Sequence, residues 1–238
     1  MLASLLFAVS AQVSADSETQ FSEARAELVS TIETRVRDAS NYLGKSYLDP
    51  RVIAAMGDVP RHEFVPVKLR GAAYENRPLP IGYQQTISQP SLVAMMTDLL
   101  QLPDACHVLE VGTGSGYQAA ILGELCAKVY TIEIVEPLGQ QAKNLLGELG
   151  YENVHVRVGD GYAGWPEHAP YDGVIVTAAV NEPPAPLVEQ LRPGGRMVIP
   201  LGQRRGYQEL VVIEKRADGS VSERKIFPVR FVPFTRDQ

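Results

Sequence analysis

Val108-Leu109-Glu110-Val111-Gly112-Thr113-Gly114-Ser115-Gly116-Tyr117 is the stretch of sequence that decides the fold. A short, mostly apolar run breaks into three glycines spaced by two, and the following residues 118–122 favour a helix. Glycine allows positive φ and lets a ligand lie against bare backbone. The first N–H groups of a helix attract anionic groups. We therefore predict a strand, a tight ligand-binding turn and a helix.

Two features of this turn separate the cofactors that it could bind. A dinucleotide-binding turn has the pattern G-x-G-x-x-G, whereas Tyr117 stands where the third glycine would be. A carboxylate near the end of a buried strand needs a cation or several donors, and the ammonium of S-adenosyl-L-methionine would be such a cation beside Glu110. The E-x-G-x-G-x-G turn resembles the first motif of class I methyltransferases. The alternative is a glycine-rich turn without a ligand.

Three more predicted strands end in polar residues. Glu133 ends the strand 128–133, 21 residues after Gly112, where an acid can accept hydrogen bonds from the ribose hydroxyls of adenosine. Asp160-Gly161 follow the strand 154–158 and can bind the adenine amino group, and Thr177 follows the strand 171–176. Open α/β sheets bind ligands along this edge. The predicted cofactor-binding residues are Glu110, Gly112, Thr113, Gly114, Ser115, Gly116, Glu133, Asp160, Gly161 and Thr177.

The later strands complete the predicted sheet. A fifth strand covers 196–201, and residues 210–214 and 225–234, joined through Asp218-Gly219, predict an antiparallel hairpin at the sheet's edge. The predicted fold class is therefore α/β, a Rossmann-like, doubly wound, mostly parallel seven-stranded sheet with N-terminal helices. We predict one domain over 16–238, in which 16–106 form the helices and a substrate wall and 107–238 form the cofactor-binding sheet.

Composition and charge exclude several classes of function. A formal net charge of -6 with scattered Lys and Arg gives no basic surface for a nucleic acid. Cys106 and Cys126 form no C-x-x-C pair, so we expect small buried apolar residues and no metal site. The four histidines are far apart in the sequence, without ligand spacing.

The N-terminal part of the chain predicts a leader and two helices. Residues 1–15 are apolar and end in Val13-Ser14-Ala15, which fits a signal-peptide cleavage site although the positively charged start is missing. This run is too short to span a bilayer, so it is either a processed export signal or a mis-started or disordered leader. Residues 17–41 predict an amphipathic helix that Gly44 ends. A second helix begins after Asp49-Pro50.

The segment between these helices and the first strand is polar and rich in Gly and Pro. We expect it to lie outside the core, as a lid or a substrate wall. Within it, Gln85-Thr86-Ile87-Ser88-Gln89-Pro90 brings short polar side chains together just before a predicted helix, 91–100. One interpretation is a capping turn in which Ser88 or Gln89 satisfies helix donors. The other is a substrate-binding loop.

Six stretches of the chain resemble the bacterial protein-L-isoaspartate O-methyltransferases. They are Pro60-Arg61-His62-Glu63-Phe64-Val65, Leu79-Pro80-Ile81-Gly82, Gln85-Thr86-Ile87-Ser88-Gln89-Pro90, Val108 to Tyr117, Val176-Thr177-Ala178-Ala179 and Arg230-Phe231-Val232-Pro233. The Q-T-I-S-Q-P stretch is much more specific than the glycine turn. The resemblance implies methyl transfer from S-adenosyl-L-methionine to the free α-carboxylate of L-isoaspartyl residues in damaged proteins, which begins their repair.

The resemblance also implies roles for individual residues. Ser88 would be the active-site residue, Thr86 and Gln85 would line the substrate pocket, and Val232 would contact the substrate backbone. It implies a monomer in the cytoplasm that acts on proteins or peptides without nucleic acid, membrane or metal. The periplasm is the alternative if the leader is a functional signal peptide. Gln84 stands where the family usually has glycine, which predicts an altered loop shape and substrate range.

Other functions remain open on the sequence. The first alternative is a methyltransferase for another acceptor, in which Gln84 would mark the change of substrate. The second is a non-catalytic domain that binds S-adenosyl-L-methionine and a protein partner. An NAD-dependent oxidoreductase is disfavoured by Tyr117.

Overall fold

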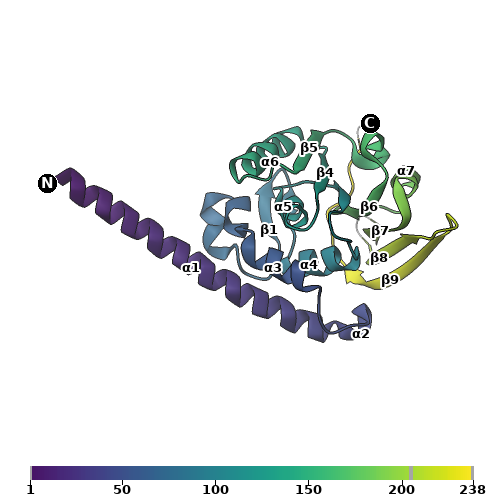
Figure 1. Cartoon of the computed structure of the whole chain (residues 1–238), viewed down its shortest axis with the longest axis horizontal. Helices are drawn as coiled ribbons and strands as arrows, with labels where there is room; N and C mark the ends of the chain where they lie inside the picture. The colour runs from purple at the N-terminus through teal and green to yellow at the C-terminus, as the bar shows by residue number, and fades with distance from the viewer. Residues whose placement is uncertain (1, 204–205, 237–238) are drawn as a thin grey trace.

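The computed structural model describes residues 2–203 and 206–236, with side chains from Thr19 onward. Its centre is a seven-stranded sheet with the order β5-β4-β3-β6-β7-β8-β9 (Figure 1). The strands are β3 His107–Val111, β4 Lys128–Glu133, β5 Val154–Val158, β6 Tyr171–Val176, β7 Leu191–Gly202, β8 Gln208–Lys215 and β9 Val221–Val229. The first five in this order run parallel, and β8 and β9 add antiparallel pairings. The predicted fold class is confirmed.

Both faces of the sheet are covered, as the apolar strands require. The helices are α1 Leu2–Asp38, α2 Ser40–Leu43, α3 Pro50–Asp58, α4 Pro90–Leu99, α5 Tyr117–Gly123, α6 Glu136–Glu148 and α7 Ala185–Glu189. Side chains alternate along β3, so that Val108 packs in one core with α1, α3, α4 and α5, while Leu109 and Val111 pack in a second core with α7. The β3 strand is therefore held from both sides.

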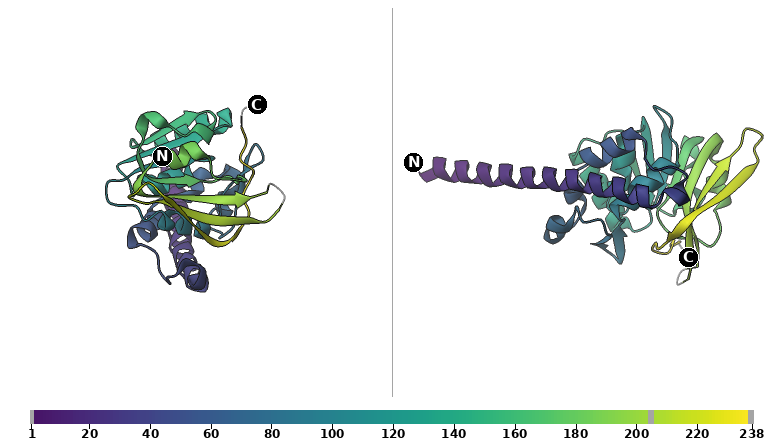
Figure 2. Two further views of the ribbon diagram at one scale, coloured as in Figure 1. Left: turned by 90° about the vertical axis from the view of Figure 1, so that its right-hand side faces the viewer. Right: turned by 90° about the horizontal axis from the view of Figure 1, so that it is seen from below.

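Helix α1 is longer than the predicted helix, which begins at residue 17. Its N-terminal half extends away from the body, whereas its C-terminal half lies along it (Figures 1 and 2). Leu28, Ile32 and Val36 are buried against the body, as expected of the apolar face of the predicted amphipathic helix. Of the predicted leader, Met1 lies outside the described residues and 2–15 belong to α1. No helix in the described part of the chain is both long and apolar enough to cross a membrane.

The expectation that the polar segment before the sheet lies outside the core is wrong. Two 3-10 helices, η1 Arg61–Phe64 and η2 Val67–Ala72, precede a separate hairpin of β1 Leu79–Gly82 and β2 Gln85–Ile87. Arg61, Phe64 and Ile87 are all buried. A polar sequence can enter the core here because its donors find backbone acceptors within the same segment, as Arg61 Nε does with the carbonyl oxygen of Ala73 at 2.8 Å.

The two cysteines are buried as predicted, but they are not separate apolar residues. Cys106 and Cys126 form a disulfide. Each stands just before one of two adjacent parallel strands, and the N–H of Lys128 donates to the carbonyl oxygen of Cys106 at 3.2 Å. Strand pairing thus brings the two sulfurs together across 20 residues of sequence. Among the residues described, no group of three or more His, Cys, Asp or Glu side chains could hold a metal ion.

The C-terminal hairpin is shifted from its predicted bounds, since β8 is longer than 210–214 and β9 both begins and ends earlier than 225–234. Strand β9 ends at Val229, not at residue 234, because its partner β8 begins at Gln208, the residue opposite Val229, and offers no further backbone to pair with. The chain instead leaves the sheet and runs beside the end of β6, where Ala179 N donates to the carbonyl oxygen of Val232 at 2.8 Å and Phe234 N to that of Ala179 at 2.9 Å. This C-terminal segment, 230–236, thereby reaches the edge where the parallel strands end.

Candidate active site

A pocket lies at the carboxyl ends of β3, β4 and β6, where the strand order reverses and open α/β sheets bind ligands. Most of the predicted site residues line it. These are Gln85, Thr86, Ser88, Glu110, Gly112, Thr113, Gly114, Ser115, Glu133, Gly161, Thr177 and Val232. Two predicted residues, Gly116 and Asp160, do not line it.

The glycine turn has the backbone that its sequence predicts. Gly112, Gly114 and Gly116 have φ of 101°, 55° and 91°. A Cβ at Gly112 would lie 2.3 Å from Oγ1 of Thr177, whose hydroxyl donates to the carbonyl oxygen of Gly112 at 2.7 Å. Gly116 is instead the N-cap of α5, where a Cβ would press on Leu146 at 3.2 Å. The turn therefore packs against Thr177 at the end of β6 on one side and against Leu146 of α6 on the other, and its bare backbone faces the pocket.

Glu110 places a carboxyl group inside the protein at the pocket wall, with 0% of the residue exposed. Its Oε2 accepts a hydrogen bond from Thr131 at 2.6 Å, so the Thr113 hydroxyl, 2.6 Å from that of Thr131, must be the donor in their contact. Oε1 has no hydrogen-bond partner among the described residues. Burial raises the pKa of Glu110 to about 8, with a further contribution from the charge of Glu133. An ammonium group in the pocket would satisfy this oxygen.

Glu133 holds the second carboxylate of the pocket and is 5% exposed. Its Oε2 accepts from the N–H of Gly114 at 2.7 Å, and its Oε1 accepts from the N–H of Val135 at 2.9 Å. Each oxygen keeps a lone pair for a further donor. The two carboxyl groups and the bare glycine turn together fit a ligand that carries an ammonium group, a pair of hydroxyls and a flat ring system. S-adenosyl-L-methionine has these three groups.

Asp160 lies at the rim instead of the wall. Its Oδ1 accepts from the N–H of Tyr162 at 2.9 Å, and its Oδ2 pairs with Arg236 Nε at 3.2 Å. The Arg236 guanidinium also stacks on Tyr162, 3.7 Å from the ring centroid. The predicted contact of Asp160 with adenine stays a prediction. Its neighbour Gly161 does reach the wall, where a Cβ would lie 2.4 Å from Cγ1 of Val111.

Ser88 stands where the pocket opens into a neighbouring groove. It lines both cavities together with Thr86, Thr177 and Val232. The capping interpretation of this stretch does not hold, since the N-cap Gln89 makes no side-chain capping bond. The Ser88 hydroxyl has no hydrogen-bond partner within the part of the chain that the structure describes.

The groove is walled by segments far apart in sequence. One side comes from the end of α1 and from Tyr42, and the other from β9 and the C-terminal segment. Tyr42 meets Phe227 edge-to-face, with ring centroids 6.3 Å apart. Gln84 lines neither this groove nor the pocket, although its φ of 59° is one that favours glycine.

Several pocket residues were not predicted from the sequence. Phe234 and Thr235 line the pocket, yet the alternating pattern of 225–234 assigned Phe234 to a strand. Pro233, which has no N–H to donate to a ladder, is a signal against a strand that runs through Phe234. Ile134 and Val135 also line it, and their position just after Glu133 at a strand end could have indicated this.

The comparison with known families agrees with this geometry. The family model of protein-L-isoaspartate(D-aspartate) O-methyltransferase matches residues 41–238. The chain belongs to this family. Its curated relatives include a protein-L-isoaspartate O-methyltransferase 2 of Syntrophobacter fumaroxidans, 57% identical over 90% of this chain and 87% of that protein. A protein of the same name from Polaromonas is 58% identical over 87% of this chain and 99% of its own length.

Solved structures of the family share the fold. A protein-L-isoaspartate O-methyltransferase with 29% sequence identity superposes with a TM-score of 0.76 over 88% of this chain, which spans just under two thirds, 65%, of that longer chain. A protein of Plasmodium falciparum, described as a family member in complex with S-adenosyl-L-homocysteine, superposes with a TM-score of 0.74 over 89% of this chain and 98% of that chain. At 22% identity, this second likeness concerns the fold alone.

Proposed function

We propose that this chain transfers the methyl group of S-adenosyl-L-methionine to the free α-carboxylate of L-isoaspartyl residues in damaged proteins and peptides, which begins their repair. The observation that carries the proposal is a pocket with a buried carboxyl oxygen of Glu110 and, where a groove begins, the Ser88 hydroxyl, neither of which has a hydrogen-bond partner among the described residues. Membership of the family and the names of its curated relatives support the same activity.

The donor-binding end of the pocket is proposed to work through fixed acceptors. Glu110 would bind the ammonium, Glu133 the ribose hydroxyls, and the turn from Gly112 to Gly116 the body of the donor, with Asp160, Gly161 and Thr177 around the adenosine. When bound, S-adenosyl-L-methionine supplies an electrophilic methyl group on a positively charged sulfur. Both carboxylates are held by the fold itself, so little reorganisation is needed when the donor enters.

At the acceptor-binding end, the protein needs to orient the substrate carboxylate and does not need to remove a proton from it. A carboxylate is already ionised at neutral pH, so its methylation needs no strong general base. The Ser88 hydroxyl can donate a hydrogen bond to one carboxylate oxygen and leave the other aimed into the pocket, while Thr86, Gln85 and Val232 line the passage. Such alignment of the reacting atoms contributes several kcal/mol on its own.

Ser88→Ala tests the acceptor-binding role. We expect kcat/KM for an isoaspartyl peptide to fall about 10- to 100-fold, the usual worth of a hydrogen bond to a charged group. The dissociation constant of S-adenosyl-L-homocysteine, measured by calorimetry, should stay unchanged. Ser46→Ala is the matched control, because Ser46 is exposed and lines neither cavity. Unchanged kcat/KM in Ser88→Ala would exclude the proposed role.

The acceptor itself can be tested on the wild-type protein. Methyl incorporation into an isoaspartyl peptide, the matching aspartyl peptide and RNA should occur with the first alone. Methylation of either other acceptor at a comparable rate would favour a different methyltransferase. Tight donor binding without any methyl ester on aged proteins would favour a non-catalytic binding domain.

For the compartment we propose the cytoplasm, where the donor is made, and a monomer that acts on protein or peptide substrates. The disulfide between Cys106 and Cys126 favours the periplasm as the second candidate, because disulfides persist in oxidising compartments. The intact mass of the native protein separates the two. A chain that keeps residues 1–15 with two free thiols supports the cytoplasm, whereas cleavage after Ala15 with an intact disulfide supports export.

A further inference from the structure

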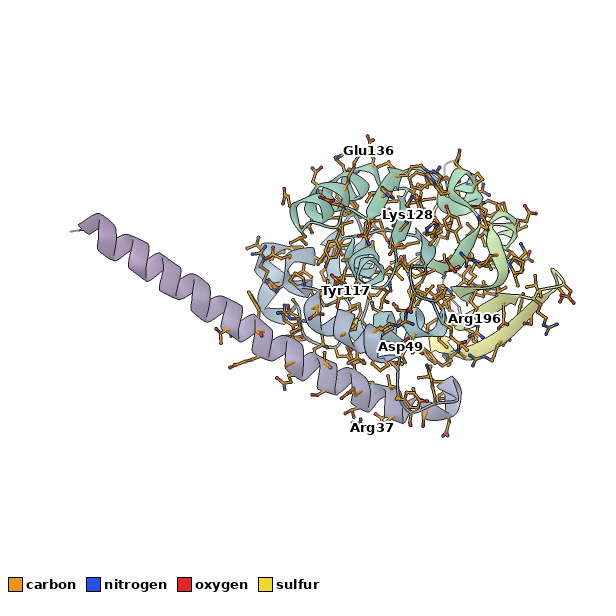
Figure 3. The ribbon with its side chains drawn as sticks, viewed as in Figure 1. Arg37, Asp49, Tyr117, Lys128, Glu136 and Arg196 are labelled. Carbon is orange, nitrogen blue, oxygen red and sulfur yellow. A yellow bond between two sulfur atoms is a disulfide. The ribbon has the colours of Figure 1, made fainter. Side chains whose placement is uncertain are left out.

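Arg61 buries a guanidinium group in the interior of the protein. The residue is 0% exposed, and within the described residues it forms no ion pair. Its guanidinium lies over the ring of Tyr117, 4.7 Å from the centroid, and Figure 3 shows Tyr117 within the body of the molecule. Burial lowers the pKa of Arg61, yet an arginine stays charged in proteins. A buried cation without a carboxylate is costly, so its presence calls for a specific task.

The guanidinium joins two segments that are distant in the sequence. Nη2 donates to the carbonyl oxygen of Ser88 at 2.8 Å, and Nε donates to that of Ala73 at 2.8 Å. Nη1 has no partner among the described residues. Only a forked side chain can reach both carbonyls at once. Arg61 therefore links Ser88, which follows β2, to Ala73, which follows η2.

Ser88 has neighbours that are held in place, since Ile87 pairs with Leu79 and Ser91 N donates to Asn76 at 3.0 Å, but its own peptide is held through the bond from Arg61. The β1–β2 hairpin forms its own two-stranded sheet, apart from the central one. Ser88 lies after the last residue of β2 and before α4, which begins at Pro90. The Ser88 hydroxyl has no hydrogen-bond partner among the described residues. The bond from Arg61 to the Ser88 carbonyl therefore fixes the peptide plane between residues 88 and 89, and this plane sets the direction in which the Ser88 side chain leaves the backbone.

We propose that Arg61 is the positioning residue for Ser88: it never touches substrate, and it orients the acceptor-binding hydroxyl through the Ser88 carbonyl. This inference rests on the proposed function. It assigns a task to an arginine that lines neither the pocket nor the groove. The hydrogen bonds of Arg61 go to Ala73 and Ser88, and it meets the donor-binding end through the ring of Tyr117, which lines the pocket. Since methionine can keep a packing contact with that ring, the substitution should affect the acceptor-binding end more than the donor-binding end.

A double-mutant cycle tests the proposal. The wild type, Arg61→Met, Ser88→Ala and the double variant are compared by kcat/KM for an isoaspartyl peptide and by the dissociation constant of S-adenosyl-L-homocysteine. We expect Arg61→Met to lower kcat/KM at least tenfold with the dissociation constant within threefold of wild type. In the Ser88→Ala background the same change should lower kcat/KM less than threefold, because the residue through which Arg61 acts is gone.

Two further variants make the cycle decisive. Arg70→Met is the matched control, since Arg70 lies in the neighbouring 3-10 helix and pairs with Glu63 at 2.5 Å without a bond to Ser88. It should keep kcat/KM within twofold of wild type. If Arg61→Met does not fold, Arg61→Lys replaces it in the cycle: it keeps the charge but reaches only one of the two carbonyls. We expect Arg61→Lys to lose activity in the wild-type background and not in Ser88→Ala.

Three results would overturn the proposal. They are equal losses of kcat/KM in both backgrounds, weaker S-adenosyl-L-homocysteine binding in parallel with lost activity, and wild-type activity of the Arg61 variant. If the wild type itself forms no methyl ester, the proposed function fails, and amide hydrogen exchange still tests Arg61. Faster exchange in 85–92 with unchanged exchange in 110–116 supports positioning, and unchanged exchange in both segments contradicts it.

Discussion

At the scale of single residues, Glu110 couples donor binding to pH. Its pKa of about 8 means that the carboxyl is mostly protonated at pH 7 while the pocket is empty, whereas an ammonium ligand prefers the carboxylate. Binding of the ligand therefore lowers this pKa and releases a proton below pH 8. Since the ionised form is the one that binds, affinity should rise as the pH rises toward the unliganded pKa and level off above it.

Calorimetry of S-adenosyl-L-homocysteine binding checks this coupling. Between pH 6 and 7.5 we expect the association constant to rise by up to about tenfold per pH unit, with release of about one proton. The proton count comes from titrations in buffers of different ionisation enthalpy. Glu110→Gln should bind more weakly and release no proton through this group. Equal proton release by the wild type and by Glu110→Gln would rule out Glu110 as its source.

At the scale of elements, the β1–β2 hairpin carries a strained turn. Tyr83 and Gln84 have φ of 49° and 59°, as a two-residue hairpin turn of this hand requires at both positions. Glycine adopts such angles without a steric penalty, so the glycine that the resemblance implies at position 84 would fit this turn. The backbone thus keeps the angle that glycine would take, and the side chain of Gln84 is exposed.

Gln84→Gly should relieve this strain. We expect the free energy of unfolding to rise by about 0.5 kcal/mol, because the relief slightly exceeds the greater freedom of glycine in the unfolded chain. Urea denaturation measures the change, and kcat/KM for an isoaspartyl peptide should stay within about twofold because Gln84 lines neither cavity. Gln85→Gly, one residue further along in β2, is the control and should lower stability. A loss of stability in Gln84→Gly would contradict the account of the turn.

The same scale shows what the sequence could predict. Strands β4, β5 and β6 have the predicted bounds, because each is a short β-branched run between breakers, and their ends bring Glu133, Gly161 and Thr177 to one edge. Local sequence patterns could not predict the contacts between segments that are distant in the sequence. The bond from Arg61 to Ser88 spans 27 residues, and the pairing of the C-terminal segment with Ala179 depends on packing around β6. Local periodicity carries no information about either.

At the scale of the whole molecule, the disulfide secures the sheet on the side away from the site. Cys106 and Cys126 precede β3 and β4, whereas the pocket lies where these strands end. Reduction should lower the free energy of unfolding by about 3 kcal/mol, as expected for a loop of this length. S-adenosyl-L-homocysteine affinity should not change while the protein stays folded.

Urea denaturation with and without reductant measures this loss. The double variant Cys106→Ala, Cys126→Ala is the control, and its midpoint should be insensitive to reductant. Two free thiols in the purified, non-reduced protein, together with coincident denaturation curves, would show that the bond does not form in solution.

The walls of the pocket extend from Gln85 to Thr235, so no short fragment of the chain can hold the donor. Ligand binding is thereby linked to the folding of the whole central sheet, and saturating ligand should stabilise it as one cooperative unit. The number of binding sites found by titration with the ligand should therefore equal the number of correctly folded molecules. A molecule in which any of these wall segments is unfolded should not bind the ligand.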